Sequence, residues 1–190
     1  LASDIELLQS GKHPGKTNIT DADNALNILR YLTDSPCAVI VKHNNPCGVA
    51  RADSLADAYD RANMADRVAA FGGAIALNRE VDRETAELIC ENYAEVVVAP
   101  AFGEGVLDIF AAKKNLRVMR IEDMAKLEAY AGERVVDFKS LIDGGIIVQW
   151  SFVPEARKAG DLTLGTTAYK DQTYTIAREP TAQEYEDMIF

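Results

Sequence analysis

The stretch Ala38–Gly48, AVIVKHNNPCG, decides the fold of this 190-residue chain. It begins with the apolar run Ala38–Val41, which is mostly β-branched, and then changes abruptly to polar and turn-forming residues. A short apolar run bounded by turn residues is typical of a central strand that is buried on both faces. Pro46 and Gly48 predict that the chain turns after this strand and does not continue as a helix.

A cluster of reactive side chains follows the predicted strand. It supplies a cation, an imidazole, two amides and a thiol, from Lys42, His43, Asn44, Asn45 and Cys47. In open α/β sheets, ligands bind in the crevice beyond the carboxyl ends of the strands. The cluster therefore predicts a functional site, and a solvated loop is the alternative interpretation.

Apolar periodicity predicts helices and strands that alternate along the rest of the chain. Thr20, Ser54 and Asp82 each stand where an N-cap residue would precede a helical pattern. Strands are expected at 74–77, 96–99 and 116–121, and helices at 83–93, with Tyr93 facing the core, and at 104–114. This alternation predicts an α/β fold, a three-layer α/β/α sandwich with a mixed sheet.

Composition excludes some classes of partner. A formal net charge of -10 argues against binding to nucleic acid or to an anionic membrane. An anionic ligand stays possible because Lys42, Lys113 and Lys114 could form a local cationic cluster. No apolar stretch reaches the roughly 20 residues that span a bilayer. The odd count of three cysteines suggests reduced thiols and a cytoplasmic protein, and a first residue Leu1 suggests a piece of a longer chain.

Several blocks of the sequence resemble one enzyme family. KHNNPCG at 42–48 is similar to the motif KHxNPCG of the aminoimidazole carboxamide ribonucleotide (AICAR) transformylase half of a bienzyme whose other half is inosine monophosphate (IMP) cyclohydrolase. ADRVAAFGGAIALNREVD at 65–82 resembles the family's ADPxSAFGGIIALNxxxD. Further matches follow in the family's order: EVVVAPAF at 95–102, KKNLR at 113–117, DGGIIVQ at 143–149 and REPTAQEYEDMIF at 178–190.

The resemblance implies a cytidine-deaminase-like fold and a formyltransferase of purine biosynthesis. Residues 1–180 would form the first lobe of the transformylase domain, and residues 181–190 would begin a helix that leads into a second lobe. The implied reaction transfers a formyl group from 10-formyltetrahydrofolate to AICAR, giving formyl-AICAR (FAICAR). The implied protein is a homodimer, and its longer form could also carry IMP cyclohydrolase activity. A noncatalytic nucleotide-binding or assembly lobe is the alternative function.

Lys42 and His43 are the catalytic residues that the resemblance implies. The AICAR amine is a poor nucleophile, because its lone pair is delocalised into the imidazole carboxamide, so the step needs proton removal and charge stabilisation. A neutral imidazole at His43 suits the base. Lys42 suits the developing oxyanion or the departing folate nitrogen. Because successive strand residues point to opposite faces, both can serve one centre only if the strand has turned at Lys42.

Substrate contacts are implied for residues of four matched blocks: Asn45, Pro46, Phe71, Gly72, Glu95 and Lys114. Phe71 and Gly72 would line the ligand cleft, Glu95 would lie near the ribose or base, and Lys114 would contact the phosphate. For three of these residues, a purely structural role is the alternative to substrate binding. Lys114 could simply favour a helix C-terminus, Glu95 could be solvated, and Phe71 could belong to the core.

Zinc chemistry is the rival that the implied fold brings with it. Zinc deaminases carry an H-x-E…P-C-x-x-C signature. Pro46 and Cys47 match part of it, but Ala50 stands where the second cysteine would be and asparagines follow His43. The ligand set is incomplete, so no metal is expected. The family's LRYGxNPHQ and GQxSR blocks are also absent, and these residues are therefore expected to lack part of the folate site.

Overall fold

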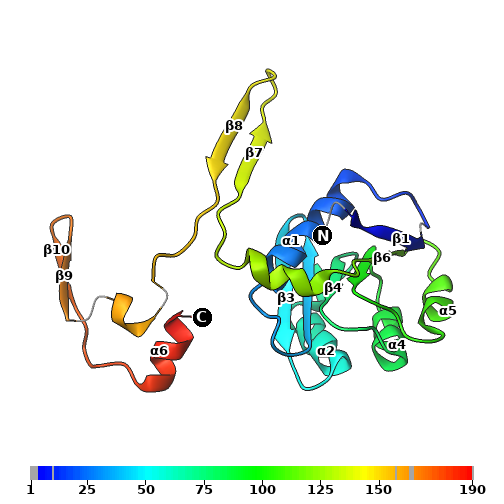
Figure 1. The fold of residues 1–190 in the computed structure, drawn as a ribbon, viewed down its shortest axis with the longest axis horizontal. Helices are drawn as coiled ribbons and strands as arrows, with labels where there is room; N and C mark the ends of the chain where they lie inside the picture. Colours follow the sequence, from blue (N-terminus) through cyan, green and yellow to red (C-terminus); the bar gives the residue numbers. More distant parts are fainter. Residues whose placement is uncertain (1–3, 10, 157, 163–164, 190) are drawn as a thin grey trace. The chain divides into compact units, whose positions relative to one another are not determined.

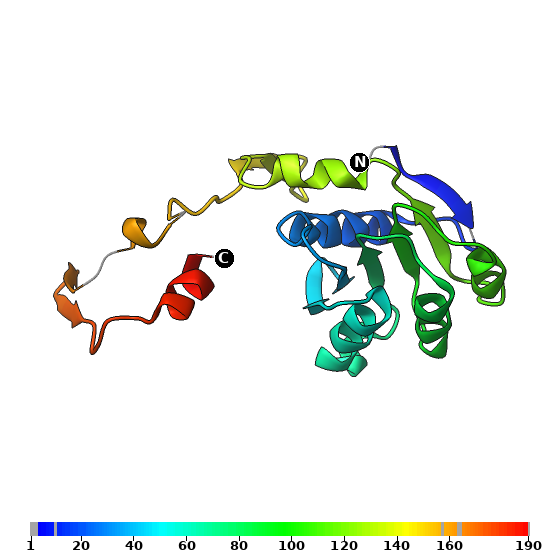
Figure 2. The same cartoon turned by 60° about the horizontal axis from the view of Figure 1, so that its bottom comes forward.

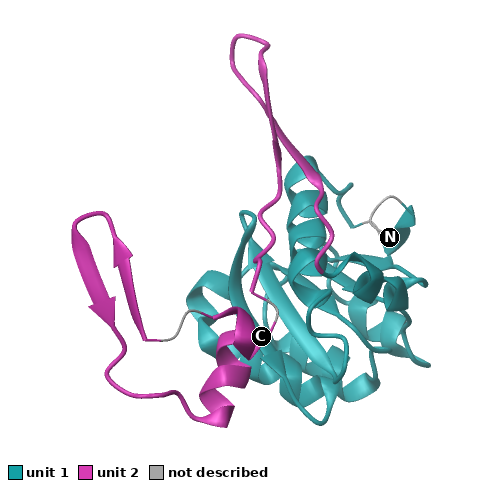
Figure 3. Ribbon diagram, turned by 60° about the vertical axis from the view of Figure 1, so that its left-hand side comes forward, with its two compact units in different colours: residues 1–131 teal, residues 132–190 magenta. Residues whose placement is uncertain are grey.

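The structure is a computed structural model that describes residues 4–9, 11–156, 158–162 and 165–189. The chain divides into two compact units, residues 1–131 and residues 132–190, which Figure 3 draws in different colours. Unit 1 holds a large sheet with helices on both faces, and unit 2 holds two small β-ribbons and a helix.

Unit 1 is built on a six-stranded mixed sheet with the strand order β1-β6-β5-β4-β2-β3 (Figure 1). Strands β4, β5 and β6 are parallel, whereas β1, β2 and β3 each run antiparallel to their neighbours. The strand bounds are β1 Glu6–Gln9, β2 Cys37–Lys42, β3 Asn45–Arg51, β4 Ala74–Leu77, β5 Val96–Ala99 and β6 Arg117–Arg120. The prediction of a mixed α/β sheet is confirmed.

Helices cover both faces of this sheet and complete the predicted three layers (Figure 2). One face packs against α1 and the 3₁₀ helix η2, and the other packs against α2, α4 and α5. A short helix α3 precedes β4. The bounds are α1 Lys16–Leu29, α2 Leu55–Ala65, α3 Arg67–Ala70, α4 Arg83–Glu91, α5 Val106–Ala111 and η2 Met124–Tyr130.

Strand β2 is buried on both faces, as its apolar run predicts. Ile40 packs into the core beneath α2, α4 and α5, whereas Val39 and Val41 pack into the core beneath α1. Each of these side chains is at most 1% exposed, and burying one contributes about 1.5–3 kcal/mol. The prediction that this strand lies at the centre of the sheet was wrong, because β2 is an inner strand second from the edge.

The chain turns directly after β2, as the sequence predicted, and the turn is that of a tight β-hairpin. His43 and Asn44 form the turn with φ values of 54° and 63°, and Asn45 already begins β3. Pro46 is tolerated in a strand because β3 is the edge of the sheet. The register shifts opposite Ile40 and Val41, so the ladder of β3 has a bulge just after Pro46.

Some predicted element starts hold and others do not. The Ser54 hydroxyl accepts a hydrogen bond from the Asp57 N–H, and the Asp82 carboxylate caps α4 in the same way. The Thr20 cap was wrong, because α1 already begins at Lys16 behind Gly15. The Asn18 side chain accepts from the Gly15 N–H, and the helix starts five residues earlier than a cap at Thr20 would allow.

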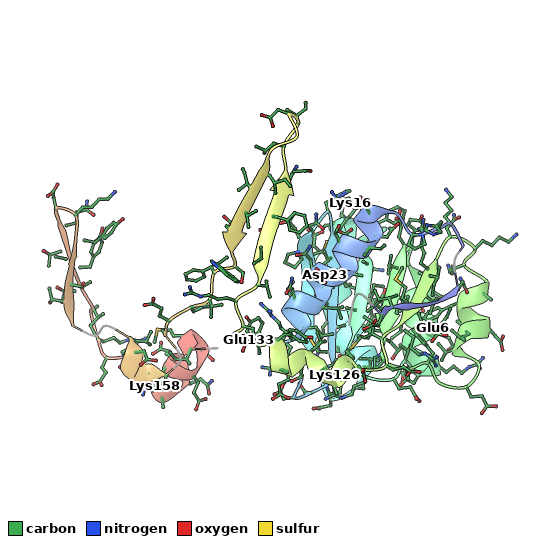
Figure 4. All side chains as sticks on the ribbon, turned by 45° about the horizontal axis from the view of Figure 1, so that its top comes forward. Glu6, Lys16, Asp23, Lys126, Glu133 and Lys158 are labelled. Carbon is green, nitrogen blue, oxygen red and sulfur yellow. The ribbon has the colours of Figure 1, made fainter. Side chains whose placement is uncertain are left out.

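Strand β1 was not predicted at all, since its sequence, ELLQ, offers only two adjacent apolar residues between polar ones. It pairs antiparallel with β6 at the other edge of the sheet. Arg120 Nε donates to the Glu6 carboxylate at 2.8 Å across this pair, and Figure 4 labels Glu6 on β1. An exposed edge strand needs little apolar surface, so its sequence carries a weak signal.

Unit 2 is made of short elements with extensive exposed surface. Its Gly144–Gly145 bend joins β7 to β8, and Gly144 has a φ of 87° that suits glycine. Thr181 and Glu184 form a capping box at the start of the last helix. Arg178 lowers the pKa of Glu184 to about 2. The bounds are β7 Val136–Ser140, β8 Ile146–Trp150, η3 Ala159–Asp161, β9 Thr166–Tyr169, β10 Gln172–Thr175 and α6 Ala182–Ile189.

Among the described residues, no helix has the length and apolar character needed to cross a membrane.

Cys37 at the start of β2 gives a test of this core. Its side chain is 0% exposed, and burial raises the pKa of the thiol from 9.0 to about 11. Because the thiolate is the reactive form, iodoacetamide at pH 8 is expected to alkylate Cys37 at least about 100-fold more slowly in the native than in the urea-unfolded protein. Peptide mass spectrometry would measure this, and equal rates in both states would contradict the packing.

Candidate active site

The predicted site residues gather at one end of the strands of the sheet in unit 1. Val41 of β2 pairs with Ala74, Ala74 with Val96, and Val96 with Arg117, so these four residues form one row across four strands. This row lies at the carboxyl end of β2 but at the amino ends of β4, β5 and β6. The carboxyl-end expectation therefore holds for β2 alone, because β2 runs antiparallel to its neighbour β4.

The β2–β3 hairpin presents Lys42 and His43. Lys42 is the last residue of β2, and His43 and Asn44 are exposed turn residues in the left-handed region. That region is uncommon for residues other than glycine, although asparagine and histidine enter it more often than most. The carboxylate of Asp21 on α1 accepts hydrogen bonds from the N–H of His43 at 3.2 Å and of Asn44 at 2.7 Å. The turn is thus held from outside the hairpin.

Two further contacts fix the ends of this hairpin turn. Lys42 Nζ donates to the carbonyl oxygen of Phe71 at 2.7 Å, which ties β2 to the loop before β4. An ammonium group has three donors, so this bond leaves others for a ligand. Asn45 Nδ2 donates to the carbonyl oxygen of His43 at 2.8 Å across the turn. Pro46 follows as an exposed residue of β3.

Phe71, Gly72 and Tyr93 form an aromatic ledge beside Lys42. The rings of Phe71 and Tyr93 lie 5.0 Å apart between centroids, and Phe71 is 60% exposed. Gly72 has a φ of 77° and donates its N–H to the Tyr93 carbonyl at 2.7 Å. A Cβ on Gly72 would approach the Tyr93 ring to 3.4 Å. Phe71 is therefore not a core residue, and Tyr93, which was expected to face the core, is 38% exposed.

Glu95 lies next to this ledge with its side chain 38% exposed. Its carboxylate accepts from Asn18 Nδ2 at 2.9 Å and lies 3.6 Å from a nitrogen of the Arg117 guanidinium. Arg117 is nearly buried, and it also donates to the carbonyl oxygens of Lys12 and Asn115. Glu95 is therefore not simply solvated, because a fixed amide and a fixed cation orient it.

Lys114 lies at a pocket of about 260 Å³. Tyr93, Lys113, Lys114 and Asn115 contribute to the pocket wall, and Tyr93 thereby joins the pocket to the aromatic ledge. Both lysines are exposed at this wall. The pocket has the size and the positive charge for a small anion such as a phosphate group. Lys114 lies just beyond α5, which ends at Ala111, so it does not belong to the last turn of that helix.

The structure brings the hairpin residues into contact with the aromatic ledge and Glu95, whereas Lys114 is connected to them less directly. The hairpin residues touch the aromatic ledge through Lys42, and the ledge approaches Glu95 at Gly72. Lys114 joins them only through the wall that Tyr93 provides. The sequence did not reveal the polar residues that hold these groups, Asn18, Asp21 and Arg117, because their partners lie far away along the chain.

Comparison with known proteins identifies the family. The model of the AICARFT/IMPCHase bienzyme family matches residues 2–190. The chain belongs to this family.

Two curated relatives are bifunctional purine biosynthesis proteins PurH. The chain is 41% identical to that of Acetivibrio thermocellus over 180 residues, which are 95% of this chain and 32% of the relative. It is 39% identical to that of Bacillus subtilis over 178 residues, which are 94% of this chain and 31% of the relative. The chain thus spans about a third of the length of the curated relatives that it matches.

The AICARFT/IMPCHase match contains every residue that the sequence placed in the site. Within the described part of this family member, no three His, Cys, Asp or Glu side chains converge as metal ligands would. Burial raises the pKa of the Cys47 thiol, and the carboxylate of Asp66 adds to the effect.

Proposed function

We propose that this chain forms the first lobe of a folate-dependent formyltransferase that converts AICAR to FAICAR with 10-formyltetrahydrofolate. The observation that carries the proposal is the contact of Lys42, the residue directly before His43, with the backbone of the exposed aromatic ledge. Membership of the AICARFT/IMPCHase family supports the same reaction. Residues 1–180 belong to this lobe, and residues 181–190 begin a helix towards a second lobe of a cytidine-deaminase-like fold.

In the proposed mechanism, His43 removes a proton from the AICAR amine while the amine nitrogen attacks the formyl carbon. Lys42 stabilises the charge on the formyl oxygen or delivers a proton to the departing folate nitrogen. The local backbone supports this pairing. Strand β2 ends at Lys42 and His43 already has a left-handed φ, so the alternation of a strand no longer forces the two side chains to opposite faces.

In the same proposal, the remaining residues bind the nucleotide. The exposed ring of Phe71 offers a plane on which a heterocycle stacks, and the lack of a side chain at Gly72 leaves the backbone accessible. Glu95 accepts hydrogen bonds from the ribose or the base. Lys114 neutralises the phosphate at the edge of its pocket. Asn45 and Pro46 shape the wall beside the hairpin.

Other parts of the longer protein complete the folate site. We propose a cytoplasmic homodimer that binds AICAR and reduced folate, without a metal ion, nucleic acid or membrane as partner, and whose longer chain carries the IMP cyclohydrolase half. The bienzyme family name and the partial coverage of the relatives support the cyclohydrolase part of this proposal.

The decisive experiment is formyl transfer by the full-length protein. Purified protein is mixed with AICAR and 10-formyltetrahydrofolate, and the release of tetrahydrofolate is followed together with the formation of FAICAR or IMP. Turnover with AICAR supports the proposal. Specific binding of AICAR without any turnover would favour the alternative, a noncatalytic nucleotide-binding lobe.

Replacing Lys114 by alanine tests the phosphate contact. We expect the KM for AICAR to rise about 10- to 100-fold with kcat nearly unchanged, because a charge-assisted hydrogen bond of about 1.5–3 kcal/mol is lost in the ground state and the transition state alike. Steady-state kinetics would measure this. Lys126→Ala is the control, since Lys126 lies on η2 and pairs with Asp123 (Figure 4). A fall in kcat at constant KM would contradict the assignment.

A further inference from the structure

Helix α1 directs three polar side chains towards the candidate site. Asn18 donates to Glu95, Asp21 accepts from the hairpin turn, and Asn24 Nδ2 donates to the Asn44 side chain at 3.2 Å. Residues three positions apart on a helix lie on the same side of it. Asp21 is the most unusual of the three, because a carboxylate that is only 5% exposed is rare unless it is paired or hydrogen-bonded.

The hairpin turn has a conformational problem of its own. Two-residue hairpins with positive φ at both central positions favour Asn-Gly or Asp-Gly, whereas this turn contains His43 and Asn44. A side chain in the left-handed region costs roughly 1–2 kcal/mol per residue. The turn is therefore expected to relax unless an external contact holds it.

Asp21 provides that contact. Its two carboxylate oxygens take one N–H each, Oδ2 from His43 and Oδ1 from Asn44. Hydrogen bonds to an ionised acceptor are about twice as strong as neutral ones. The buried carboxylate gains the partners that it requires, and the same two bonds fix the backbone from which the His43 imidazole projects.

We propose that Asp21 is a positioning residue, whose buried carboxylate locks the His43–Asn44 turn and thereby sets the imidazole of His43 for proton removal. The inference rests on the proposed formyltransferase function for its catalytic half. A displacement of about 1 Å at a reacting group can reduce a rate about 100-fold. Asp21 thus acts on the reaction through His43 and makes no contact with substrate.

The test uses Asp21→Asn in the full-length protein. The amide keeps one acceptor, but its NH₂ group cannot accept from a backbone N–H. We expect kcat for AICAR formylation to fall about 10- to 100-fold, with the KM for AICAR changing less than about threefold. Asp23→Asn is the matched control, since Asp23 is an exposed acid on the same helix (Figure 4), and it should leave kcat unchanged.

A second substitution separates positioning from a general loss of structure. Glycine enters the left-handed region without a Cβ penalty, so Asn44→Gly in the Asp21→Asn background should restore kcat at least about threefold. Hydrogen exchange at the amides of His43 and Asn44, followed by NMR, should be at least about tenfold faster in Asp21→Asn than in the wild type. This second readout does not depend on turnover.

The outcomes distinguish the two proposals. A fall in kcat with faster exchange and partial rescue supports the role of Asp21. Unchanged exchange in Asp21→Asn, or a loss of kcat that Asn44→Gly does not restore, would overturn it while leaving the formyltransferase function intact. A wild type that turns over no AICAR would overturn the proposed function, and the catalytic role of Asp21 with it.

Discussion

Replacement of His43 by alanine in the full-length protein is expected to reduce kcat for AICAR formylation by about 10²- to 10⁴-fold, the usual contribution of a general base. The AICAR amine has little nucleophilicity of its own, so removal of its proton must accompany attack. His43 is exposed on the hairpin turn, and alanine there removes no buried packing. The melting temperature should therefore change little, and steady-state kinetics on folded protein would measure the loss.

The chain supplies its own control for this experiment. It contains two histidines, and the other, His13, is an exposed residue whose Nδ1 lies 3.0 Å from the Pro14 carbonyl oxygen. His13→Ala should retain wild-type turnover. If His43→Ala retained more than about a tenth of the wild-type kcat, His43 would not be the base, and the noncatalytic alternative would gain support.

Replacement of Gly48 by alanine is expected to destabilise unit 1 by about 3 kcal/mol or more, the upper range for overpacking in a well-packed core. A Cβ at Gly48 would lie 1.8 Å from the carbonyl oxygen of Ala62 and 2.7 Å from its carbonyl carbon. Both atoms belong to the backbone of α2, so no side chain can rotate away. Either β3 or α2 must shift, and both pack on the core around Ile40.

Urea denaturation of the purified protein would measure this effect as a shift of the transition midpoint. Gly15→Ala is the matched control in the same unit, because the nearest atom to a Cβ there, the Asn18 side-chain oxygen, lies 3.9 Å away. We expect that control to cost at most about 1 kcal/mol, the range for an N-cap change. Equal midpoints for the two variants would show that the approach of β3 to α2 is looser than the structure has it.

Gly48 also illustrates what the sequence could not reveal. The motif suggested a turn residue, because Pro and Gly within a few positions of each other usually punctuate the chain. The structure places Gly48 inside β3, where its missing side chain admits the backbone of α2. Close approach of two backbones depends on tertiary packing, so a local pattern cannot distinguish it from a turn.

The buried part of the fold followed from local pattern. Apolar runs such as Val96–Ala99 predicted the inner strands, since a strand covered on both faces must be apolar throughout. The edge elements were different. Strand β1 has an apolar run of only two residues, Leu7 and Leu8, which is too short to give that signal. The His43–Asn44 turn lacks the glycine that normally marks such a hairpin.

The candidate site divides in the same way. Lys42 and His43 could be nominated from the sequence, because reactive side chains cluster directly after an apolar run and because they match the family's motif. Asp21, Asn18 and Arg117 were missed because each acts through a partner that lies more than twenty positions away in the sequence. Asp21 also lies within a helical pattern, where an acidic residue is usually assigned to the solvent-exposed face of the helix.

Helix α1 sets a fixed separation between two tasks of the proposed enzyme. Asn18 contacts Glu95, for which we propose a role in nucleotide binding, and Asp21 contacts the turn that bears His43. Three residues correspond to about 4.5 Å along a helix axis. The two contacts therefore start from neighbouring positions on one helix, so a displacement of α1 would disturb both of them at once.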